Sequence, residues 1–573
     1  MKKFLLSAVL ALCAATNFGL WAVKPKDFSK QQTTIFVKSV DNQDSGCLYF
    51  SKSTGSIPYV DVLTMLNKLN WQDFCSVKKG ERHYTIVRND NGAEVCFNQD
   101  QKVITFSDFD LFRKKKDAGT LLDIVDDYYY IVHEPFGFET RGAPIDIHYD
   151  TFLIDIAIDK DLCLIPLQTF SDIFASSVFG TFLYNGKDCF FVSSSEALQN
   201  DDGDLTELGK KYYEIEPGPM DIDYADFNMR ELALNCQLNY GLKDLHGIEK
   251  FSDWLAARDL IDPLSSTDSY EVDFAVAEIC HRYLGDIHSS FCVHSPRSKR
   301  DVKPEEKRDI MISPSLQRIR QSMQEAQQMR ASFFPKGVPG VQTIGDTVYV
   351  TFDSFWTDNS RDYYKNPITE EEKARVLLDY HSSGIDTRGL INVANQIVQA
   401  DKNIRNVVVD VSCNLGGQLD AAIFVACWLL GRADLRIKSG ITGSQSSTSY
   451  MADINFNEKI DDADTVRDRR IFCLVSDITF SCGNILASTL EESGKATLIG
   501  SKTGGGACAV LLTSTASGTL FKTSSFYRFS AEKNGAFNAV DDGVSPDYKL
   551  TELRSFYNRS DKDGLTAFIR KLY

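Results

Sequence analysis

The stretch that decides the fold is VSDITFSCGNILASTLEES, residues 475–493. The apolar run 471–475 that leads into it is typical of a buried strand, and the spacing of apolar residues after it predicts a helix. Ser481 lies between the two, where backbone N–H groups and the positive end of a helix dipole favour a developing negative charge. Serine is also a common N-cap. Two interpretations of Ser481 therefore stay open, a nucleophile and a cap.

Strands and helices alternate around this stretch from about residue 345 onward. IRNVVVDVS (404–412) predicts an apolar strand, CNLGGQ (413–418) a tight loop and LDAAIFVACWLLG (419–431) a buried helix. Such alternation favours parallel strand pairing with helices packed on the sheet. The sequence thus predicts an α/β core in this region.

Two adjacent glycines, Gly416 and Gly417, stand in the tight loop. Glycines after a buried strand let the backbone approach a ligand closely. If that strand neighbours the one before Ser481, the amides of Gly416, Gly417 and Cys482 would form an oxyanion hole. An ordinary strand-to-helix turn is the alternative.

A serine nucleophile needs a base, and His288 in YLGDIHSSFCVH (283–294) is the candidate. It follows a helix end marked by Gly285 and precedes a strand-like run, and Asp286 would shape the turn. A zinc site was weighed as the alternative, but the spacing of its ligands fits no common pattern, so we expect no metal. Those possible ligands are Cys280, His281, His288, Cys292 and His294.

Four segments together resemble the tail-specific, or C-terminal processing, peptidases, the S41 serine peptidases. They are DTVYVTFDSF (346–355), VVVDVSCNLGGQLDAA (407–422), TFSCGNILASTLEESGKATLIGSKTGGGACAV (479–510) and DDGVSPDYKL (541–550). Their order and spacing match over roughly residues 225–550. The resemblance implies a crotonase-like α/β core preceded by a small helical domain. It puts Ser481 on the family's nucleophile, and Gly416 and Gly417 on its NPGG-like oxyanion loop, with Leu415 in place of proline.

The family has two versions of the catalytic base. In one, a lysine follows the serine by about 25 residues, but that position is Gly506 here and Lys502 lies four residues early, so the serine–lysine dyad is absent. The other version resembles the tricorn core and the chlamydial secreted protease, and it uses a histidine in a D-x-H context. GDIHSS (285–290) fits this second version and implies that His288 is the base.

The second version also uses a Glu just before a G-[VI]-x-P turn to orient the histidine. The turn here is GVSPD (543–547), and Val540 stands where the Glu is expected. Asp541 and Asp542 are the nearest carboxylates, and we predict that Asp541 accepts the imidazole N–H and stabilises the imidazolium. A turn-forming pair of aspartates is the alternative.

Composition narrows the classes of partner. The chain has 573 residues and a formal net charge of −17, which argues against nucleic acid as a partner. Two lysines followed by an apolar run at the N-terminus predict a secretory signal peptide, and no later segment is apolar for long enough to span a membrane. We therefore expect an exported protein, periplasmic, cell-surface or secreted. Its fourteen scattered cysteines do not form a disulfide framework.

The pattern divides the chain into five expected segments. Two Ile-Pro motifs at residues 57–58 and 165–166, each followed by a helical pattern and strands, indicate an internal duplication. The expected segments are a signal peptide (1–22), duplicated small α+β modules for binding or spacing (33–200), a helical domain carrying His288 (225–296), a charged helical linker (297–340) and the catalytic core (341–573).

The sequence as a whole predicts a secreted serine endopeptidase that acts on proteins or peptides, with a homodimer as a possible assembly and no cofactor. Ser481 would attack the scissile carbonyl after His288 takes its proton. A catalytically inactive surface protein that keeps the fold for binding is the main alternative. A serine esterase and a Cys482 nucleophile are the remaining ones.

Overall fold

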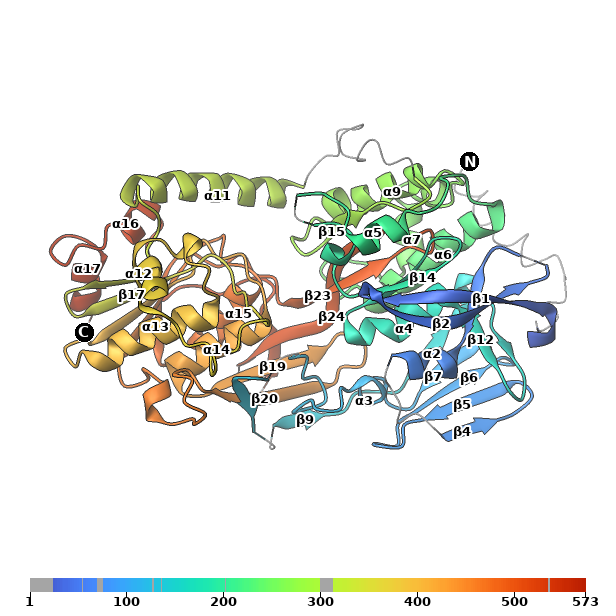
Figure 1. The fold of residues 1–573 in the computed structure, drawn as a ribbon, viewed down its shortest axis with the longest axis horizontal. Helices are drawn as coiled ribbons and strands as arrows, with labels where there is room; N and C mark the ends of the chain where they lie inside the picture. The colour runs from blue at the N-terminus through green and yellow to red at the C-terminus, as the bar shows by residue number, and fades with distance from the viewer. Residues whose placement is uncertain are drawn as a thin grey trace.

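The computed structural model describes residues 24–53, 55–69, 76–125, 128–134, 137–200, 202–298, 313–533 and 536–572. The expected signal peptide, residues 1–22, lies outside them. Figure 1 shows two lobes along the long axis, one with the N-terminal half and the helical region, the other with the α/β core. The long strand β24, Leu520–Lys533, passes from one lobe into the other.

The α/β lobe is built on a six-stranded sheet in the order β16-β17-β18-β21-β22-β26. The pairs from β17 through β26 are parallel, as the alternation of strands and helices predicts. Val408 packs with the C-terminal helices, whereas Val407 and Val409 face the main core, so β18 is buried on both faces. The strands are β16 Val341–Ile344, β17 Thr347–Thr351, β18 Asn406–Asp410, β21 Arg470–Val475, β22 Ala496–Gly500 and β26 Tyr548–Lys549.

Helices follow these strands in the order that the sequence predicts. β18 leads through residues 411–418 into α14, and the neighbouring β21 leads through residues 476–481 into α15. Because β18 and β21 are parallel neighbours, both connections leave the same edge of the sheet. The helices of this lobe are α12 Glu370–Leu378, α13 Thr387–Ala400, α14 Leu419–Leu430, α15 Cys482–Ser493, α16 Leu553–Tyr557 and α17 Leu565–Lys571.

A second sheet joins regions that are far apart in the sequence. Its order is β15-β24-β19-β20-β8, with β23 and β25 on β24 and β9 on β20. It takes strands from three of the five expected segments, so these segments share one sheet. The strands are β8 Ile131–His133, β9 Phe138–Thr140, β15 Ser290–Val293, β19 Ala433–Ser439, β20 Gln445–Ala452, β23 Cys508–Ser514 and β25 Ala536–Ala539, together with β24.

The N-terminal half forms a seven-stranded sheet in the order β11-β12-β3-β2-β1-β14-β13. The two Ile-Pro motifs lie side by side in it, because β12 pairs with β3 at Ile165 and Val60. Asp61 caps helix α2 through Thr64 and also accepts a hydrogen bond from the Cys163 amide, 3.2 Å away. The elements are β1 Phe28–Val37, β2 Ser39–Ser51, β3 Pro58–Asp61, α2 Val62–Lys68, β11 Ala157–Ile158, β12 Cys163–Pro166, α4 Leu167–Ile173, β13 Thr181–Tyr184 and β14 Cys189–Val192. The duplication itself stays a prediction.

A five-stranded antiparallel sheet, β10-β7-β6-β5-β4, lies beside it. The Asn-Gly turn at residues 91–92 joins β5 to β6, and buried residues alternate along both strands as the period of a half-buried sheet requires. The elements are β4 Ser76–Lys79, β5 His83–Val87, β6 Glu94–Asn98, β7 Val103–Phe106, α3 Phe109–Arg113 and β10 Ile145–His148.

The region from residue 207 to 293 is mostly helical and ends in a strand. Asp221 caps α6 by accepting the Tyr224 amide at 2.9 Å, and Gly285, in the left-handed region at φ 62°, ends the last helix. This region contains α5 Glu207–Tyr212, α6 Ile222–Asn239, α7 Phe251–Ala256, α8 Ile261–Leu264, α9 Ser269–Glu278, the π-helical turn η5 Ile279–Leu284 and strand β15.

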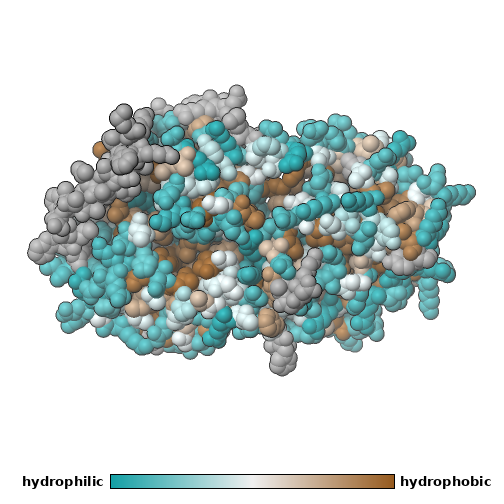
Figure 2. Space-filling model, turned by 180° about the vertical axis from the view of Figure 1, so that it is seen from behind, coloured by the Kyte–Doolittle hydropathy of each residue, from teal (hydrophilic) through white to brown (hydrophobic). Residues whose placement is uncertain are grey.

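Helix α11, Pro314–Phe333, covers most of the described part of the expected linker and reaches from one lobe toward the other (Figure 1). Within the described residues, no helix is both long and apolar enough to cross a membrane. Hydrophilic residues cover most of the face in Figure 2. The remaining short helices are η1 Pro25–Asp27, η2 Tyr149–Phe152, η3 Ala175–Val178, η4 Ser195–Ala197, η6 Tyr380–Ser382 and η7 Asp462–Asp464.

Two buried carboxyl groups face each other where the N-terminal half meets the helical region. Asp172 on α4 and Glu231 on α6 are both buried, and burial raises the pKa of both, that of Glu231 from 4.5 to about 7. Asn235 donates to Asp172 at 2.6 Å, and Thr169 donates to Glu231 at 2.7 Å. Burial therefore favours the protonated form of both carboxyl groups at this contact.

We expect the free energy of unfolding to fall as the pH rises from about 4.5 to about 7. In that window the unfolded chain has released the Glu231 proton while the folded chain still holds it, so the stabilisation is complete at low pH and lost as the pH passes the folded-state pKa. The loss is on the order of 2–3 kcal/mol. Urea unfolding of wild type and Glu231→Gln at pH 5 and pH 8 measures it, with the exposed Glu207→Gln as control. Equal pH slopes for wild type and Glu231→Gln would contradict the prediction.

Candidate active site

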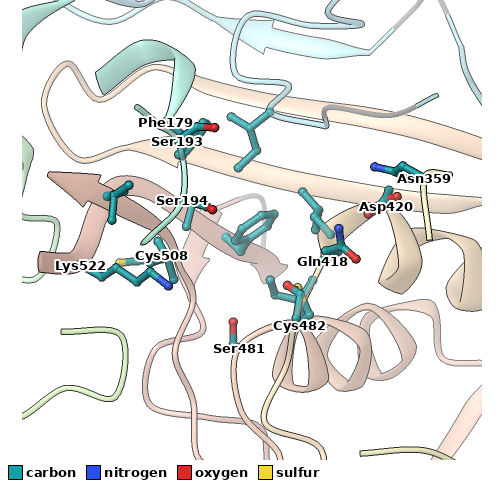
Figure 3. Close-up of a pocket in the computed structure, with 18 residues that line it drawn as sticks. Phe179, Ser193, Ser194, Asn359, Gln418, Asp420, Ser481, Cys482, Cys508 and Lys522 are labelled. Carbon is teal, nitrogen blue, oxygen red and sulfur yellow. The ribbon is translucent and has the colours of Figure 1, made fainter. Parts of the chain in front are cut away.

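Ser481 occupies the sharp turn between β21 and α15. Its backbone has φ 53° and ψ −123°, a region that non-glycine residues rarely adopt. Its side chain makes no capping hydrogen bond, so the cap interpretation of this serine does not hold. Its hydroxyl instead points into a cavity in Figure 3. The turn thus presents a serine oxygen at the start of a helix.

Backbone hydrogen bonds hold this strained turn on both sides. The Ser481 amide donates to the Gly505 carbonyl at 3.0 Å, and the Ser481 carbonyl accepts the Ile485 amide at 2.9 Å. Such a conformation costs about 1–3 kcal/mol and persists only where the surrounding structure enforces it. Strained residues of this kind cluster at functional sites.

The glycine loop lies directly against Ser481. A Cβ atom on Gly416, which has φ 104°, would lie 2.5 Å from the Ser481 Cβ and 3.0 Å from the Cys482 nitrogen. A Cβ on Gly417 would lie 2.0 Å from the Phe355 carbonyl oxygen. Both positions therefore require glycine, because backbone and serine approach too closely for any side chain.

The three amides predicted for the oxyanion hole differ in their partners. The Gly416 amide donates to Asn414 Oδ1 at 2.8 Å. For the amides of Gly417 and Cys482, no acceptor lies within the described part of the chain. The latter two are therefore available to a ligand oxygen, whereas the Gly416 amide is occupied.

Asn414 is a residue that the sequence reasoning missed. It is fully buried, and its carbonyl accepts the Phe480 amide at 3.0 Å, which ties the glycine loop to the serine turn. Leu415, which replaces the family's proline, uses the amide that proline lacks to donate to the Asp353 carbonyl at 3.2 Å. The available signal for its role was an asparagine two residues before the glycine pair.

A cavity of about 380 Å³ opens above Ser481. Gly417, Ser481 and Cys482 line it from the α/β core. The N-terminal half contributes part of the wall with Phe179, Ser193 and Ser194 (Figure 3). This contribution was not predicted, because the sequence of that half carries no chemical motif.

His288 lies in the turn between η5 and β15, next to the residue that precedes Ser481. It is 8% exposed, and its ring packs against the Phe480 ring with the ring centres 4.8 Å apart. Its Nδ1 lies 3.4 Å from the Ser524 hydroxyl oxygen, and its buried Nε2 has no partner. No hydrogen bond joins His288 to Ser481 among the residues that the structure describes. Burial lowers the pKa of His288 below 6.5, against the opposing charges of Asp286 and Asp541, so the ring is neutral at pH 7.

The backbone of Asp541 lies beside the site, but its carboxylate is engaged elsewhere. It accepts two hydrogen bonds from Arg528, at 3.0 and 2.7 Å, and one from the Ala507 amide at 3.0 Å. Within the described residues it makes no hydrogen bond to His288. The role predicted for Asp541 stays a prediction, and its charge is paired with Arg528.

Residue 506, where the other version of the family has its lysine base, has no room for a side chain. Gly506 has φ 78°, and a Cβ there would lie 2.3 Å from the Phe480 ring. A lysine at residue 506 would displace the ring that packs against His288. This geometry agrees with the absence of a serine–lysine dyad in the sequence.

Neither the Cys482 thiol nor a metal site is a better candidate than Ser481 for the catalytic centre among the described residues. Burial raises the pKa of the Cys482 thiol to about 12, and the thiol donates to the Gly417 carbonyl at 3.1 Å, so it is not a thiolate at neutral pH. In the part of the chain that the structure describes, no cluster of three or more His, Cys, Asp or Glu side chains could hold a metal ion.

Part of the chain is similar to a known family of peptidases. Residues 346–550 match the model of Peptidase family S41. No curated protein matches the chain. Among solved structures, the photosystem II D1 C-terminal processing protease is 20% identical over 38% of this chain and 46% of that one, with a TM-score of 0.25.

Two further solved structures are similar at low identity. Mature CPAF complexed with lactacystin is 10% identical over 61% of this chain and 97% of that one, with a TM-score of 0.35. A putative peptidase from Parabacteroides merdae is 14% identical over 56% of this chain and 89% of that one, also with a TM-score of 0.35. These scores are too low to carry an argument, so the assignment rests on the family match. Residues 346–550 of this chain are therefore similar to peptidase family S41, the serine peptidases.

Proposed function

We propose that this protein is an exported endopeptidase that cleaves protein or peptide chains through an acyl-enzyme on Ser481. The observation that carries the proposal is the placement of Ser481, whose hydroxyl faces a cavity from a strained strand-to-helix turn with a glycine loop against it. Export is proposed from the lysines and apolar run at the N-terminus alone. We also propose that the α/β core has the crotonase-like arrangement of the family.

In the proposed reaction, His288 Nε2 takes the proton from the Ser481 hydroxyl as its oxygen attacks the scissile carbonyl. The resulting oxyanion accepts hydrogen bonds from the amides of Gly417 and Cys482, at the positive end of α15. His288 then gives its proton to the leaving amine, and the acyl-enzyme remains. Water, deprotonated by His288, attacks the ester, and collapse of the second intermediate returns the proton to Ser481.

The unpartnered Nε2 of His288 supports this assignment of the base. A buried ring nitrogen without a partner is costly unless another group engages it during function. Proton transfer requires Nε2 to come within about 2.6–3.2 Å of the Ser481 oxygen, and catalytic hydrogen bonds often reach that distance only with substrate bound. We infer that substrate binding brings His288 and the serine turn together.

Covalent labelling tests the proposal. The purified mature chain is treated with a fluorophosphonate, which reacts with activated serines, and the site of modification is located by mass spectrometry while casein cleavage is followed in parallel. We expect labelling at Ser481 and loss of casein cleavage in proportion to it. A folded protein that neither takes the label at Ser481 nor cleaves casein would favour the inactive binding protein. Labelling with cleavage of simple esters but not of peptides would favour an esterase.

The pH dependence of the reaction follows from the burial of His288. Because burial lowers the pKa of the imidazole below 6.5, the neutral base persists to more acidic pH than an exposed histidine would. We expect the acidic limb of kcat/KM to have an apparent pKa below 6.5. Peptide hydrolysis between pH 4.5 and 8 measures it, with circular dichroism at each pH as the control for folding. An acidic limb centred above 6.5 would contradict the burial argument.

A further inference from the structure

The group next to His288 Nδ1 is the hydroxyl of Ser524. Ser524 lies in β24, is 1% exposed, and its oxygen is 3.4 Å from Nδ1. The same oxygen lies 3.1 Å from Asp286 Oδ1. Ser524 thus stands between the imidazole and a carboxylate that comes from the same turn as His288.

The chemistry of the two neighbours fixes the direction of these hydrogen bonds. An ionised carboxylate only accepts, so the Ser524 hydroxyl must give its single proton to Asp286. The Ser524 oxygen keeps its lone pairs, so toward His288 it can only accept a hydrogen bond. This arrangement requires a proton on Nδ1, and in the neutral ring it leaves Nε2 unprotonated, which is the form that a general base needs.

Asp286 is held in place by further donors. The Ser289 amide and hydroxyl donate to it at 2.9 and 2.7 Å, and the Tyr240 hydroxyl donates at 3.0 Å. Burial raises the pKa of Tyr240 above its usual value, with Asp286 adding to the shift, so the phenol stays protonated and remains a donor. The carboxylate and the hydroxyl of Ser524 are therefore fixed relative to the ring.

The other nearby carboxylate, that of Asp541, forms an ion pair with Arg528 instead. Its two hydrogen bonds from Arg528 pair its charge, and Arg528 also contacts Asp244 at 2.9 Å. Asp541 contacts no ring nitrogen of His288 among the described residues. Of the two carboxylates, only Asp286 is connected to the imidazole through a chain of hydrogen bonds.

We propose that Ser524, backed by Asp286, is the residue that positions His288: it accepts the Nδ1 proton and holds the ring in the tautomer that leaves Nε2 free to act as the base. This inference rests on the proposed function, in which His288 is the general base. The charged groups that act on His288 among the described residues are Asp286, in its own turn, and Asp541, before the final turn. Tyr240 donates to Asp286, and Arg528 and Cys508 contact Asp541.

The tautomer of His288 can be measured by NMR, with no need for an activity assay. The full chain is labelled with ¹⁵N-histidine, and the His288 resonances are assigned by comparison with His288→Gln. We expect a protonated Nδ1 and an unprotonated Nε2 in wild type at pH 7.5, and loss of this preference in Ser524→Ala. The matched control is Ser525→Ala, an equally buried neighbour whose hydroxyl oxygen accepts the Tyr527 amide, and it should leave the His288 spectrum unchanged.

Kinetics of the same variants test the positioning role. We expect Ser524→Ala to lower kcat roughly ten- to a hundredfold with KM nearly unchanged, and Ser524→Thr, which keeps the hydroxyl, to recover most of the loss. The acidic limb should move to lower pH in Ser524→Ala and in Asp286→Asn, because each change weakens the stabilisation of the imidazolium. A residue with only a structural role would change the amount of folded enzyme and not the pH profile.

The outcomes separate this inference from the proposed function. A wild-type His288 protonated on Nε2, or a tautomer that Ser524→Ala leaves unchanged, would overturn the inference even if the enzyme is active. A tautomer that depends on Ser524 while kcat and the pH limb do not change would also overturn the positioning role. Absence of Ser481 labelling in wild type at every pH would count against the proposed function, and the tautomer measurement would still decide the contact. If Ser524→Ala does not fold, the comparison of Ser524→Thr with Asp286→Asn takes its place.

Discussion

Replacement of Ser481 by alanine is expected to lower the kcat for hydrolysis of an unfolded protein by about 10⁵-fold, in the range found when a serine nucleophile is removed from a serine–histidine peptidase. The loss is large because Ser481 carries the proposed acyl bond and the adjacent Cys482 thiol is protonated, with a pKa of about 12. The residual rate would come from the amides of Gly417 and Cys482 acting on a water molecule. Initial rates of casein or quenched-peptide hydrolysis measure the effect.

Two further variants separate this effect from folding. Ser488→Ala in α15 removes a buried hydroxyl from the same helix and should retain full activity. Ser481→Gly should be as inactive as Ser481→Ala but more stable by about 1 kcal/mol, because glycine adopts φ 53° without strain. Activity above 1% of wild type in folded Ser481→Ala would show that another residue is the nucleophile.

Removal of the Asp410 carboxylate is expected to lower the free energy of unfolding by about 3–5 kcal/mol. Asp410 ends β18 and pairs with Arg559 at 2.6 Å, and both side chains are 2% exposed. Arg559 also donates to Thr351 at 2.9 Å and lies over the ring of Tyr349. In Asp410→Ala the guanidinium keeps its charge without a counterion in a buried site, which is the source of the loss. Urea unfolding followed by circular dichroism measures it.

The double variant shows whether an unpaired charge is the cause. Asp410→Leu with Arg559→Leu removes both charges, and we expect it to be more stable than either single variant, because a buried pair is often replaced by apolar residues at little cost. A double variant that loses the sum of the two single losses of unfolding free energy would contradict this explanation.

Asp410 also accepts hydrogen bonds from the Ser412 amide and hydroxyl at the start of the glycine loop. Asp410→Ala should therefore also reduce fluorophosphonate labelling of Ser481.

The parts of the fold that the sequence predicts are those governed by local pattern. The apolar runs of β18 and β21, the helices that follow them and the Ser481 turn all arise from neighbouring residues, and the structure has them as expected. The glycine pair was predictable because only glycine fits where two backbones approach closely. The mixed α/β class follows from the same alternation.

The parts that the sequence does not reveal depend on contacts between distant residues. Ser524 lies 236 residues from His288 and stands in an ordinary strand sequence, so no spacing indicates its place beside the ring. The pairing of Asp541 with Arg528 depends on the course of β24 past the final turn. Phe179 and Ser194 line the cavity only because the N-terminal half packs against the core. Tertiary packing, with no local signature, sets each of these positions.

The strand β24 also determines when the enzyme becomes complete during synthesis. The ribosome makes His288 and the adjoining strand β15 early, but their partners in β24, around residues 520–524, emerge more than 220 residues later. Chains fold from the N-terminus as they are made, so His288, the proposed base, lies beside an empty sheet position while Ser481 is still to be translated. A nascent or prematurely terminated chain would therefore lack the strand that completes the proposed catalytic site.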